Sequence, residues 1–534
     1  MIAAPARRSL DAKRPVGFAA VRSADGPPVA GRGRSKAWRR RVRSTPTRRD
    51  GLVVRGERAP GEPGADLKAA AAATVARLAP GHGIPLPRDL ALLAETQPPA
   101  APASWTDATA TYLTACLAAR ARRDALGAGM GLITRYFEGG RLTRPGTLSP
   151  GVRSQLYASA GEYCNAIGWP QMGARFSAQA LLFADTRAVR YRALSLAALG
   201  HALNGDHRSA EPDIAEAEEL FAQEDWPQEE TDHLLMLAHA HVAAARLDAP
   251  GLRSVSTRMT KARPQDSYIA FSAGAMEVVA DMFSGDLAAA RAGSRRLLSG
   301  TLRHSSHRMA RHSLVCATSD LLVAEGEHRE ALALLEPYES PEGHSICFSL
   351  HRSAALLHLG RERDLLGETD ACAAAGTDHC LRTLIPVLVR RALALNRLDH
   401  PRRARETMEA ALLLIVRTGL SATPFLMLPH RETEVLVNAA MNGHDDLLAV
   451  ASPLRAALAR AALPDSERVV SATSALLTPS ERALASLLVS PISLAQIARE
   501  RGVSLNTVKS HVRSIYQKLG VRTRAEAVER LTGE

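Results

Sequence analysis

Residues 493–521 read SLAQIARERGVSLNTVKSHVRSIYQKLGV, and this stretch decides how the C-terminal part of the chain folds. Ser504 can cap the start of a helix, and Gly520 can end that helix in the left-handed conformation. Between them, four large aliphatic residues recur at steps of three and four, so one stripe of the helix is apolar. These residues are Val508, Val512, Ile515 and Leu519.

The face opposite this stripe is polar and basic. No acidic residue occurs between Glu500 and Glu526, so nothing in this window offsets its positive charge. Gly502 lies just before the helix, where a sharp turn favours glycine, and a shorter helix precedes it. A basic helix with an apolar back that follows a glycine turn is typical of a helix-turn-helix. Its polar face carries Asn506, Lys509, Ser510, Arg513, Gln517 and Lys518.

Hydroxyl residues mark the starts of three more helices near the C-terminus. Thr478, Ser493 and Thr523 are each followed three positions later by Glu or Gln, which is the spacing of a capping box. In a capping box, the two side chains satisfy backbone N–H groups that the helix leaves unpaired. The sequence therefore predicts a four-helix DNA-binding module over residues 477–534.

This module resembles the LuxR-type DNA-binding domain of bacterial transcription regulators and is most similar to the MalT-like branch. The resemblance covers about a ninth of the chain. Pro491 departs from the family pattern by replacing a Gly. Leu494 and Gln496 replace Asn and Glu, and Ala485 replaces a larger aliphatic residue. The matching residues are Leu477, Thr478, Glu481, Ile497, Ala498, Val503, Ser504, Thr507, Val508, Lys509, His511, Ile515, Lys518, Leu519, Gly520, Val521, Arg522, Ala527 and Val528.

The resemblance implies which residues touch DNA. Lys509, Ser510 and Arg513 would reach base edges in the major groove, where Lys and Arg favour guanine O6 and N7. Phosphate contacts, which set the register without reading sequence, would come from Thr507, Lys518 and Arg522. The predicted DNA-binding set is Asn506, Thr507, Lys509, Ser510, Arg513, Lys518 and Arg522.

The resemblance also implies that the protein binds double-stranded DNA as a homodimer. In family members, the apolar side of the last helix mediates dimerisation on paired half-sites. In this chain that side carries Ala527, Val528 and Leu531.

Positive charge is concentrated at the two ends of the chain. The 534 residues carry a net charge of +12, of which residues 1–66 contribute +10 and residues 477–534 contribute +4. The stretch between them is therefore slightly acidic, and it is not expected to be a nucleic-acid surface. Aromatic residues make up only 4% of the chain, and strand-like runs of Val, Ile and Thr are missing. This composition predicts a mainly helical protein.

Residues 104–463 are predicted to form a helical-repeat domain. A turn motif recurs, in which Gly or Asp ends an apolar helix and a polar turn follows. Successive turns are 34 to 44 residues apart, which brackets the ~34-residue tetratricopeptide unit. In the three clearest copies, Ala210, Ala290 and Ala331 follow the turn glycine by five positions. The turns are at Gly168, Gly205, Asp248, Gly285, Gly326, Gly360, Asp399 and Gly443.

These repeats predict an all-α protein, a tetratricopeptide-like α-solenoid followed by the four-helix module. The array resembles those of MalT-like regulators, and an irregular all-helical domain is the alternative. Residues 1–66 are expected to be a disordered basic leader, either an arm on DNA phosphates or a solvated tail. Residues 67–103 are expected to hold a helix and a Pro-rich linker from Pro80 to Ala103. Residues 464–476 are expected to be a linker.

No catalytic chemistry is predicted. The chain contains no phosphate-binding G-x-x-x-x-G-K-[ST], although MalT-like regulators usually carry an ATPase module. The six cysteines lack a C-x-x-C spacing and are expected to be buried free thiols, with a redox sensor as the alternative. His304, His307 and His312 are interspersed with arginines, which favours a solvated basic helix face over a metal site. Residues 378–380 (Asp-His-Cys) are adjacent on a helix, so they cannot face one another.

The sequence thus predicts a bacterial, cytoplasmic transcription regulator that is not an enzyme and needs no cofactor or metal. No apolar run is long enough to span a membrane. The helical-repeat domain is expected to sense a ligand or protein partner and to control the C-terminal domain. The alternative is a protein-interaction scaffold with accessory DNA binding, and a nucleotide-driven switch would need a non-standard site.

Overall fold

The structure is a computed structural model that describes residues 64–302, 306–442, 444–461, 477–489 and 492–532. The description below concerns the compact unit that spans residues 60–534. All but the last three residues of the predicted leader lie outside the described residues. The linker predicted over 464–476 also lies outside them.

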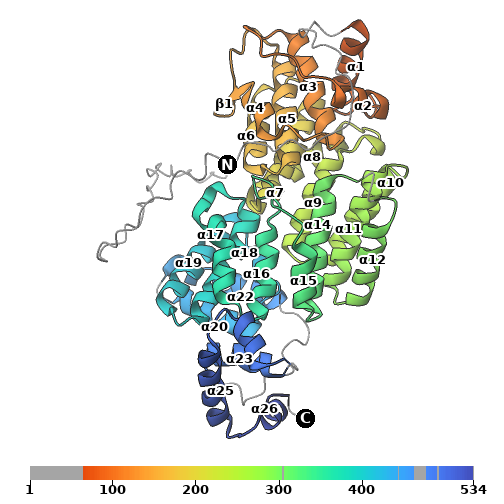
Figure 1. Ribbon diagram of the computed structural model, residues 1–534. Helices are drawn as coiled ribbons and strands as arrows, with labels where there is room; N and C mark the ends of the chain where they lie inside the picture. Colours follow the sequence, from red (N-terminus) through yellow and green to blue (C-terminus); the bar gives the residue numbers. More distant parts are fainter. Residues whose placement is uncertain (1–63, 303–305, 443, 462–476, 490–491, 533–534) are drawn as a thin grey trace, which may run out of the picture. The chain divides into compact units, whose positions relative to one another are not determined.

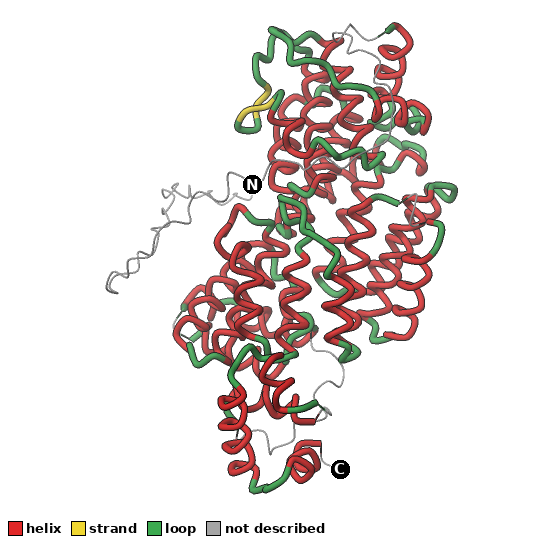
Figure 2. The backbone as a smooth tube through the Cα atoms, in the orientation of Figure 1, coloured by secondary structure: helices red, strands yellow, loops and turns green. Residues whose placement is uncertain are grey.

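The described residues fold almost entirely into α-helices, which confirms the predicted all-α class (Figure 1; Figure 2). Within these ranges the only paired strands are the antiparallel β1 (Phe137–Glu138) and β2 (Arg141–Leu142). The N-terminal helices are α1 (Ala65–Ala76), α2 (Pro87–Glu95), α3 (Asp107–Arg122) and α4 (Gly129–Thr134).

The array that follows consists of α5 (Pro150–Ile167), α6 (Pro170–Phe183), α7 (Arg187–Asn204), α8 (His207–Gln223), α9 (His233–Ala245), α10 (Ala249–Ala262), α11 (Ser267–Phe283), α12 (Leu287–Ser299), α14 (Arg308–Ala324), α15 (His328–Leu335), α16 (Phe348–His358), α17 (Glu362–Ala375), α18 (Leu381–Arg397), α19 (Pro401–Thr418), α20 (His430–Met441), α21 (Asp445–Leu448) and α22 (Ala451–Arg460). Short 3-10 turns lie at η2 (Gln228–Glu230), η3 (Gly376–Asp378) and η4 (Thr423–Phe425). The C-terminal module consists of α23 (Pro479–Val489), α24 (Leu494–Glu500), α25 (Leu505–Leu519) and α26 (Arg524–Thr532), the four helices predicted for it.

The predicted turns join the two helices of successive hairpins. Gly168 separates α5 from α6, and Gly205 separates α7 from α8; both are left-handed and end the first helix of their pair. The next five turns lie between α9 and α10, α11 and α12, α14 and α15, α16 and α17, and α18 and α19. Gly443 lies outside the described residues. In each of these hairpins the two helices pack against each other, as a repeat of helical pairs requires.

The small residue five positions after the turn has a packing role. Ala210, Ala290 and Ala331 have no exposed surface. Each lies in the first turn of the second helix of its hairpin, where the two helices are close. A larger side chain there would push the helices apart.

One predicted boundary is wrong. The stretch from Pro80 to Ala103, predicted to be a linker, contains helix α2, and Leu93 of this helix is completely buried. Pro87 occupies the first turn of α2, a position where proline is favoured because its missing N–H would be unpaired anyway. Proline at the first helical position is compatible with a helix, so the prolines of this stretch do not make all of it a linker. α1 and α2 both pack on α3.

Candidate nucleic-acid interface

Reciprocal caps start the first two helices of the C-terminal module. Ser493 and Gln496 form a complete capping box at α24: each side chain accepts the backbone N–H of the other residue. Thr478 and Glu481 make the same pair of hydrogen bonds at α23, with lengths of 2.7 and 3.3 Å. Both predicted caps are confirmed.

Helix α25 has the boundaries that its sequence predicts. The Oγ of Ser504 accepts the N–H of Thr507 at 3.0 Å, and Gly520 ends the helix with φ of 69°. Gly502, in the turn before it, has φ of 63°, which disfavours any residue with a Cβ. The predicted helix-turn-helix geometry is therefore present.

The apolar stripe of α25 forms the centre of the module's core. Its residues contact buried residues of α23 and α24, including Leu484, Leu488 and Ile497. Because the apolar stripe packs into the core, the opposite face of α25 is turned away from the rest of the module. The stripe consists of Val508, Val512, Ile515 and Leu519, all of them buried.

Most of the predicted DNA-binding residues are brought together on this outer face. Lys509, Arg513 and Arg522 line one open depression, together with Gln517 and Tyr516. All members of the predicted set are exposed. Asn506, Thr507 and Ser510 lie on the first turn and a half of α25, whereas Lys518 lies in its last turn, outside the depression. The exposed members are Asn506, Thr507, Lys509, Ser510, Arg513, Lys518 and Arg522.

Lys518 has a partner within the module. Its ammonium lies 2.6 Å from the carboxylate of Glu481 in α23, and the other oxygen of that carboxylate accepts the hydroxyl of Ser514. Burial alone would raise the pKa of Glu481, but hydrogen bonds from Lys518, Ser514 and Thr478 outweigh it and lower that pKa to about 2. This cluster fastens α25 to α23. Sequence spacing does not indicate this cluster, because Glu481 and Lys518 are far apart in the chain.

Arg524 also makes hydrogen bonds within the module, in addition to contributing positive charge. Its guanidinium donates to the backbone carbonyls of Leu488 and Ile492, at 3.0 and 2.6 Å. These bonds hold the start of α26 against the end of α23. Part of the positive charge in this acid-free window is therefore used to assemble the module.

The departures from the LuxR pattern have local structural roles. Gln496 completes a capping box, and Leu494 packs against the core of the module. Ala485 is buried in α23, 3% exposed. Pro491 lies outside the described residues.

The predicted dimerisation side of α26 is only partly available. Ala527 has no exposed surface, so it belongs to the core of the module and cannot reach a second copy. Val528 is partly buried, and the surroundings of the Leu531 side chain lie outside the description.

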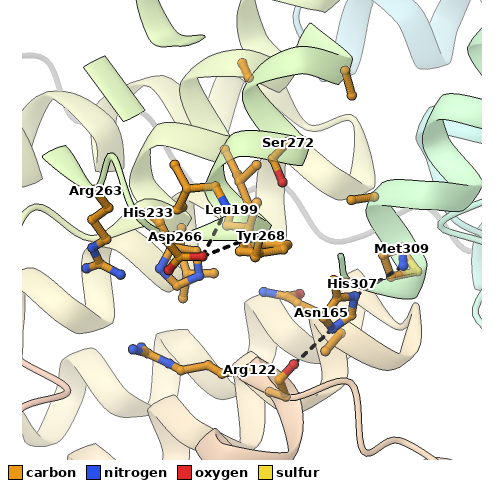
Figure 3. A pocket seen from close by; sticks show the side chains of 18 of the residues that line it. Arg122, Asn165, Leu199, His233, Arg263, Asp266, Tyr268, Ser272, His307 and Met309 are labelled. Atoms are coloured by element: carbon orange, nitrogen blue, oxygen red, sulfur yellow. Dashed lines mark hydrogen bonds between the residues drawn. The ribbon is translucent and has the colours of Figure 1, made fainter. Parts of the chain in front are cut away.

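A second candidate site is a cavity of about 780 Å³ in the helical-repeat domain (Figure 3). Side chains from α3, α5, α7, α9, α11 and α14 line it, and most of its wall is apolar. The size is in the range of small-molecule sites, about 300–1,000 Å³. Nothing in the sequence indicated it, because its lining comes from helices as far apart in the chain as α2, with Leu90, and α18, with Arg382.

Several buried polar atoms of the cavity wall have no hydrogen-bond partner within the protein. They are the side-chain amide of Asn165, the Nδ1 of His233 and the hydroxyl oxygen of Ser272. Burial, and then the charge of Arg122, lower the pKa of His233 well below its usual value, so this imidazole is neutral. Figure 3 shows all four side chains around the cavity. Unpaired buried groups of this kind are costly unless a ligand or water satisfies them.

His307 corrects the prediction of a solvated basic helix face. It caps the start of α14 through Nδ1, and its Nε2 lies 2.9 Å from the carbonyl oxygen of Ala121 in α3. His312 packs edge-on against Tyr338 and Phe348. His304 lies outside the described residues.

The six cysteines are all buried and unpaired by disulfides, as predicted. Residues 378–380 do not lie on one helix, because Asp378 ends η3, His379 follows it, and Cys380 caps α18. Within the described ranges, no helix is both long and apolar enough to cross a bilayer.

Comparison with known proteins supports one part of the chain. Residues 475–531 match the family of bacterial regulatory proteins of the luxR type. Neither the comparison with curated proteins nor the comparison with solved structures gave a match.

Proposed function

We propose that this protein binds specific sites on double-stranded DNA and regulates transcription in the cytoplasm. The proposal starts from the C-terminal domain, which matches the LuxR family of bacterial regulatory proteins. The observation that carries this proposal is the exposed, acid-free face of α25 over a fully buried apolar stripe. Such a helix can enter the major groove without disturbing its own domain.

The exposed residues divide into two roles. Lys509, Ser510 and Arg513 lie on the outer face of α25 and read base edges, with the two cations directed at guanine. Asn506 and Thr507, on the first turn of α25, and Arg522, after its end, hold phosphates. Lys518 contributes positive potential near the backbone, while Glu481 keeps its ammonium on the module.

Selection of DNA sites from a random pool by the purified full-length protein tests this function. The wild type should enrich one motif, and Lys509→Ala combined with Arg513→Ala should abolish the enrichment without unfolding the protein, since both residues are exposed. Arg403→Ala combined with Arg405→Ala removes the same charge from exposed positions on α19 and should leave the motif unchanged. If the wild type enriches no motif, the alternative of a protein-interaction scaffold is favoured.

We also propose that the repeat domain senses a small ligand in the 780 Å³ cavity. The apolar wall fits an organic body, and the unpaired groups of Asn165, His233 and Ser272 fit one or two uncharged polar substituents. The charges of Arg122 and Glu162 on the same wall are paired with each other at 2.6 Å.

A thermal-shift screen with uncharged amphipathic compounds tests the cavity. A ligand that raises the melting temperature of the wild type should fail to do so for Ser272→Phe, which fills part of the cavity. The same substitution should leave DNA-site selection intact in the absence of ligand. Equal shifts for the wild type and the variant would place binding elsewhere.

A further inference from the structure

Four side chains whose spacing in the sequence does not suggest a common site converge where α16, α17 and α18 begin or end. They are His344, Cys347, Cys372 and His379, and their potential donor atoms all lie within 4.8 Å of one another. His344 lies in the loop before α16, and Cys347 caps that helix. Cys372 lies in the last turn of α17, and His379 lies between η3 and α18.

The distance between the two sulfurs suits a shared metal ion. The Sγ atoms of Cys347 and Cys372 are 3.7 Å apart. A disulfide would bring them to about 2.05 Å. Two thiolates on one tetrahedral Zn²⁺, each about 2.3 Å from the ion, would be about 3.8 Å apart.

The two imidazoles offer free nitrogens toward this point. The Nδ1 of His344 and the Nε2 of His379 are buried and make no hydrogen bond of ordinary geometry, and the two ring centroids are 4.4 Å apart. The other nitrogen of His379 lies 3.0 Å from the carbonyl oxygen of Cys380. Such a bond holds a metal-binding histidine in the tautomer that leaves its free nitrogen for the ion.

The four side chains lie in a largely enclosed position. Three of the four residues are buried, and His344 is partly buried. A closed, four-ligand site with no position left for water is typical of structural zinc and not of catalytic zinc.

We propose that His344, Cys347, Cys372 and His379 bind one structural Zn²⁺. Two thiolates and two neutral imidazoles form a tetrahedral donor set that suits zinc and not the oxygen-preferring Ca²⁺ or Mg²⁺. Zinc binding releases any remaining thiol protons to solvent, and the negative charges of the two thiolates balance the charge of the ion. No electron transfer is involved.

The ion would tie together parts of the repeat domain that are distant in sequence. The carbonyl of His344 accepts the hydroxyl of Thr383 in α18 at 2.7 Å. The next residue, Ser345, donates its N–H to the carbonyl of Gly168 in the turn between α5 and α6, at 3.4 Å. Zinc would therefore stabilise the loop on which these contacts depend.

Metal analysis of the full-length protein tests the site. Protein purified under reducing conditions without chelator should contain one equivalent of zinc per chain, and Cys372→Ser or His379→Gln should lose it. Cys380→Ser is the matched control, since Cys380 is also buried and adjacent to His379 but directs its sulfur at the carbonyl of Leu203. This control should retain the zinc.

A second measurement uses only the wild type, in case the ligand variants fold poorly. Replacement of zinc by Co²⁺ should give the intense visible bands of tetrahedral cobalt together with sulfur-to-cobalt charge transfer. Removal of the metal by a chelator should lower the melting temperature. The proposal is overturned if the reduced wild type holds only trace zinc and gives no such bands with Co²⁺, or if Cys380→Ser loses metal as the ligand variants do.

Discussion

At the scale of single residues, the carboxylate of Glu481 connects the charge of α25 to the stability of the C-terminal module. It accepts hydrogen bonds from Ser514 and Lys518 of α25 and from the N–H of Thr478, the residue before α23. Because its pKa is lowered on folding, its stabilising effect is complete above the unfolded pKa, about 4.3, and is lost as the pH falls toward 2.

Glu481→Gln should therefore destabilise the module near neutral pH. We expect a loss of about 1.5–3 kcal/mol, the range for hydrogen bonds to a charged group. Hydrogen exchange of the α25 amides measures this loss of stability. In the wild type these amides should lose protection between about pH 5 and pH 2, and this loss should be smaller in the variant. Identical pH profiles for the two proteins would contradict the assigned role.

The residues proposed to read bases and those proposed to bind phosphates should respond differently to truncation. Arg513→Ala should weaken binding to the selected site by about 1–3 kcal/mol and relax the preference at one base position. Arg522→Ala should weaken binding to all sequences alike and reduce the salt slope by about 1. Binding titrations at several salt concentrations, on the selected site and on single-base variants, separate the two. The assignment fails if Arg522→Ala changes the preferred sequence.

At the scale of elements, the repeat works because each hairpin has a small residue where its helices are closest. Ala290 of α12 is fully buried after the turn at Gly285, whereas Ala288, two positions earlier, is exposed. Positions 288 and 290 carry the same residue in different environments, so the same substitution at both positions isolates the effect of packing.

Ala290→Leu should destabilise the protein by about 1–3 kcal/mol, because the added carbons must push α12 away from α11. Ala288→Leu should change stability by less than about 0.5 kcal/mol, since its side chain faces solvent. Urea denaturation compares the two variants. Equal effects would show that the turn motif carries no packing constraint.

At the scale of elements, the sequence predicts structural features that depend on nearby residues. Caps, turn glycines and apolar stripes act over three to seven residues, so the helices of the C-terminal module and the array turns could be predicted. The exception is α2, which begins with a proline at its first helical position inside a Pro-rich stretch typical of a linker. The same residue type starts or excludes a helix according to its position, and the local sequence did not distinguish the two cases.

At the scale of the whole molecule, a buried ionic network joins three helices beside the cavity. Glu162 of α5 accepts from Arg122 of α3 at 2.6 Å and from Arg192 of α7 at 2.9 Å. The side chain of Arg192 has no exposed surface. Removing the shared carboxylate would leave two buried guanidinium groups without a counter-charge.

Glu162→Gln should therefore destabilise the protein by about 3–5 kcal/mol. Glu216→Gln is the matched control, because Glu216 pairs with Arg190 at a position where both side chains are about half exposed. The control should cost at most about 1 kcal/mol. Denaturant unfolding of both variants gives the comparison. A control that costs as much as Glu162→Gln would exclude a special role for the buried network.

The sequence by itself determined the helices of the C-terminal module, where the hairpins turn, and which face of α25 is basic. Each of these follows from neighbours a few residues apart, whose spacing along a helix is set by its geometry. The tertiary structure decided which residues meet: the pairing of Lys518 with Glu481, the cavity wall, and the grouping of His344, Cys347, Cys372 and His379. These contacts join residues that are distant in the chain, and only the packing of whole helices determines their distances.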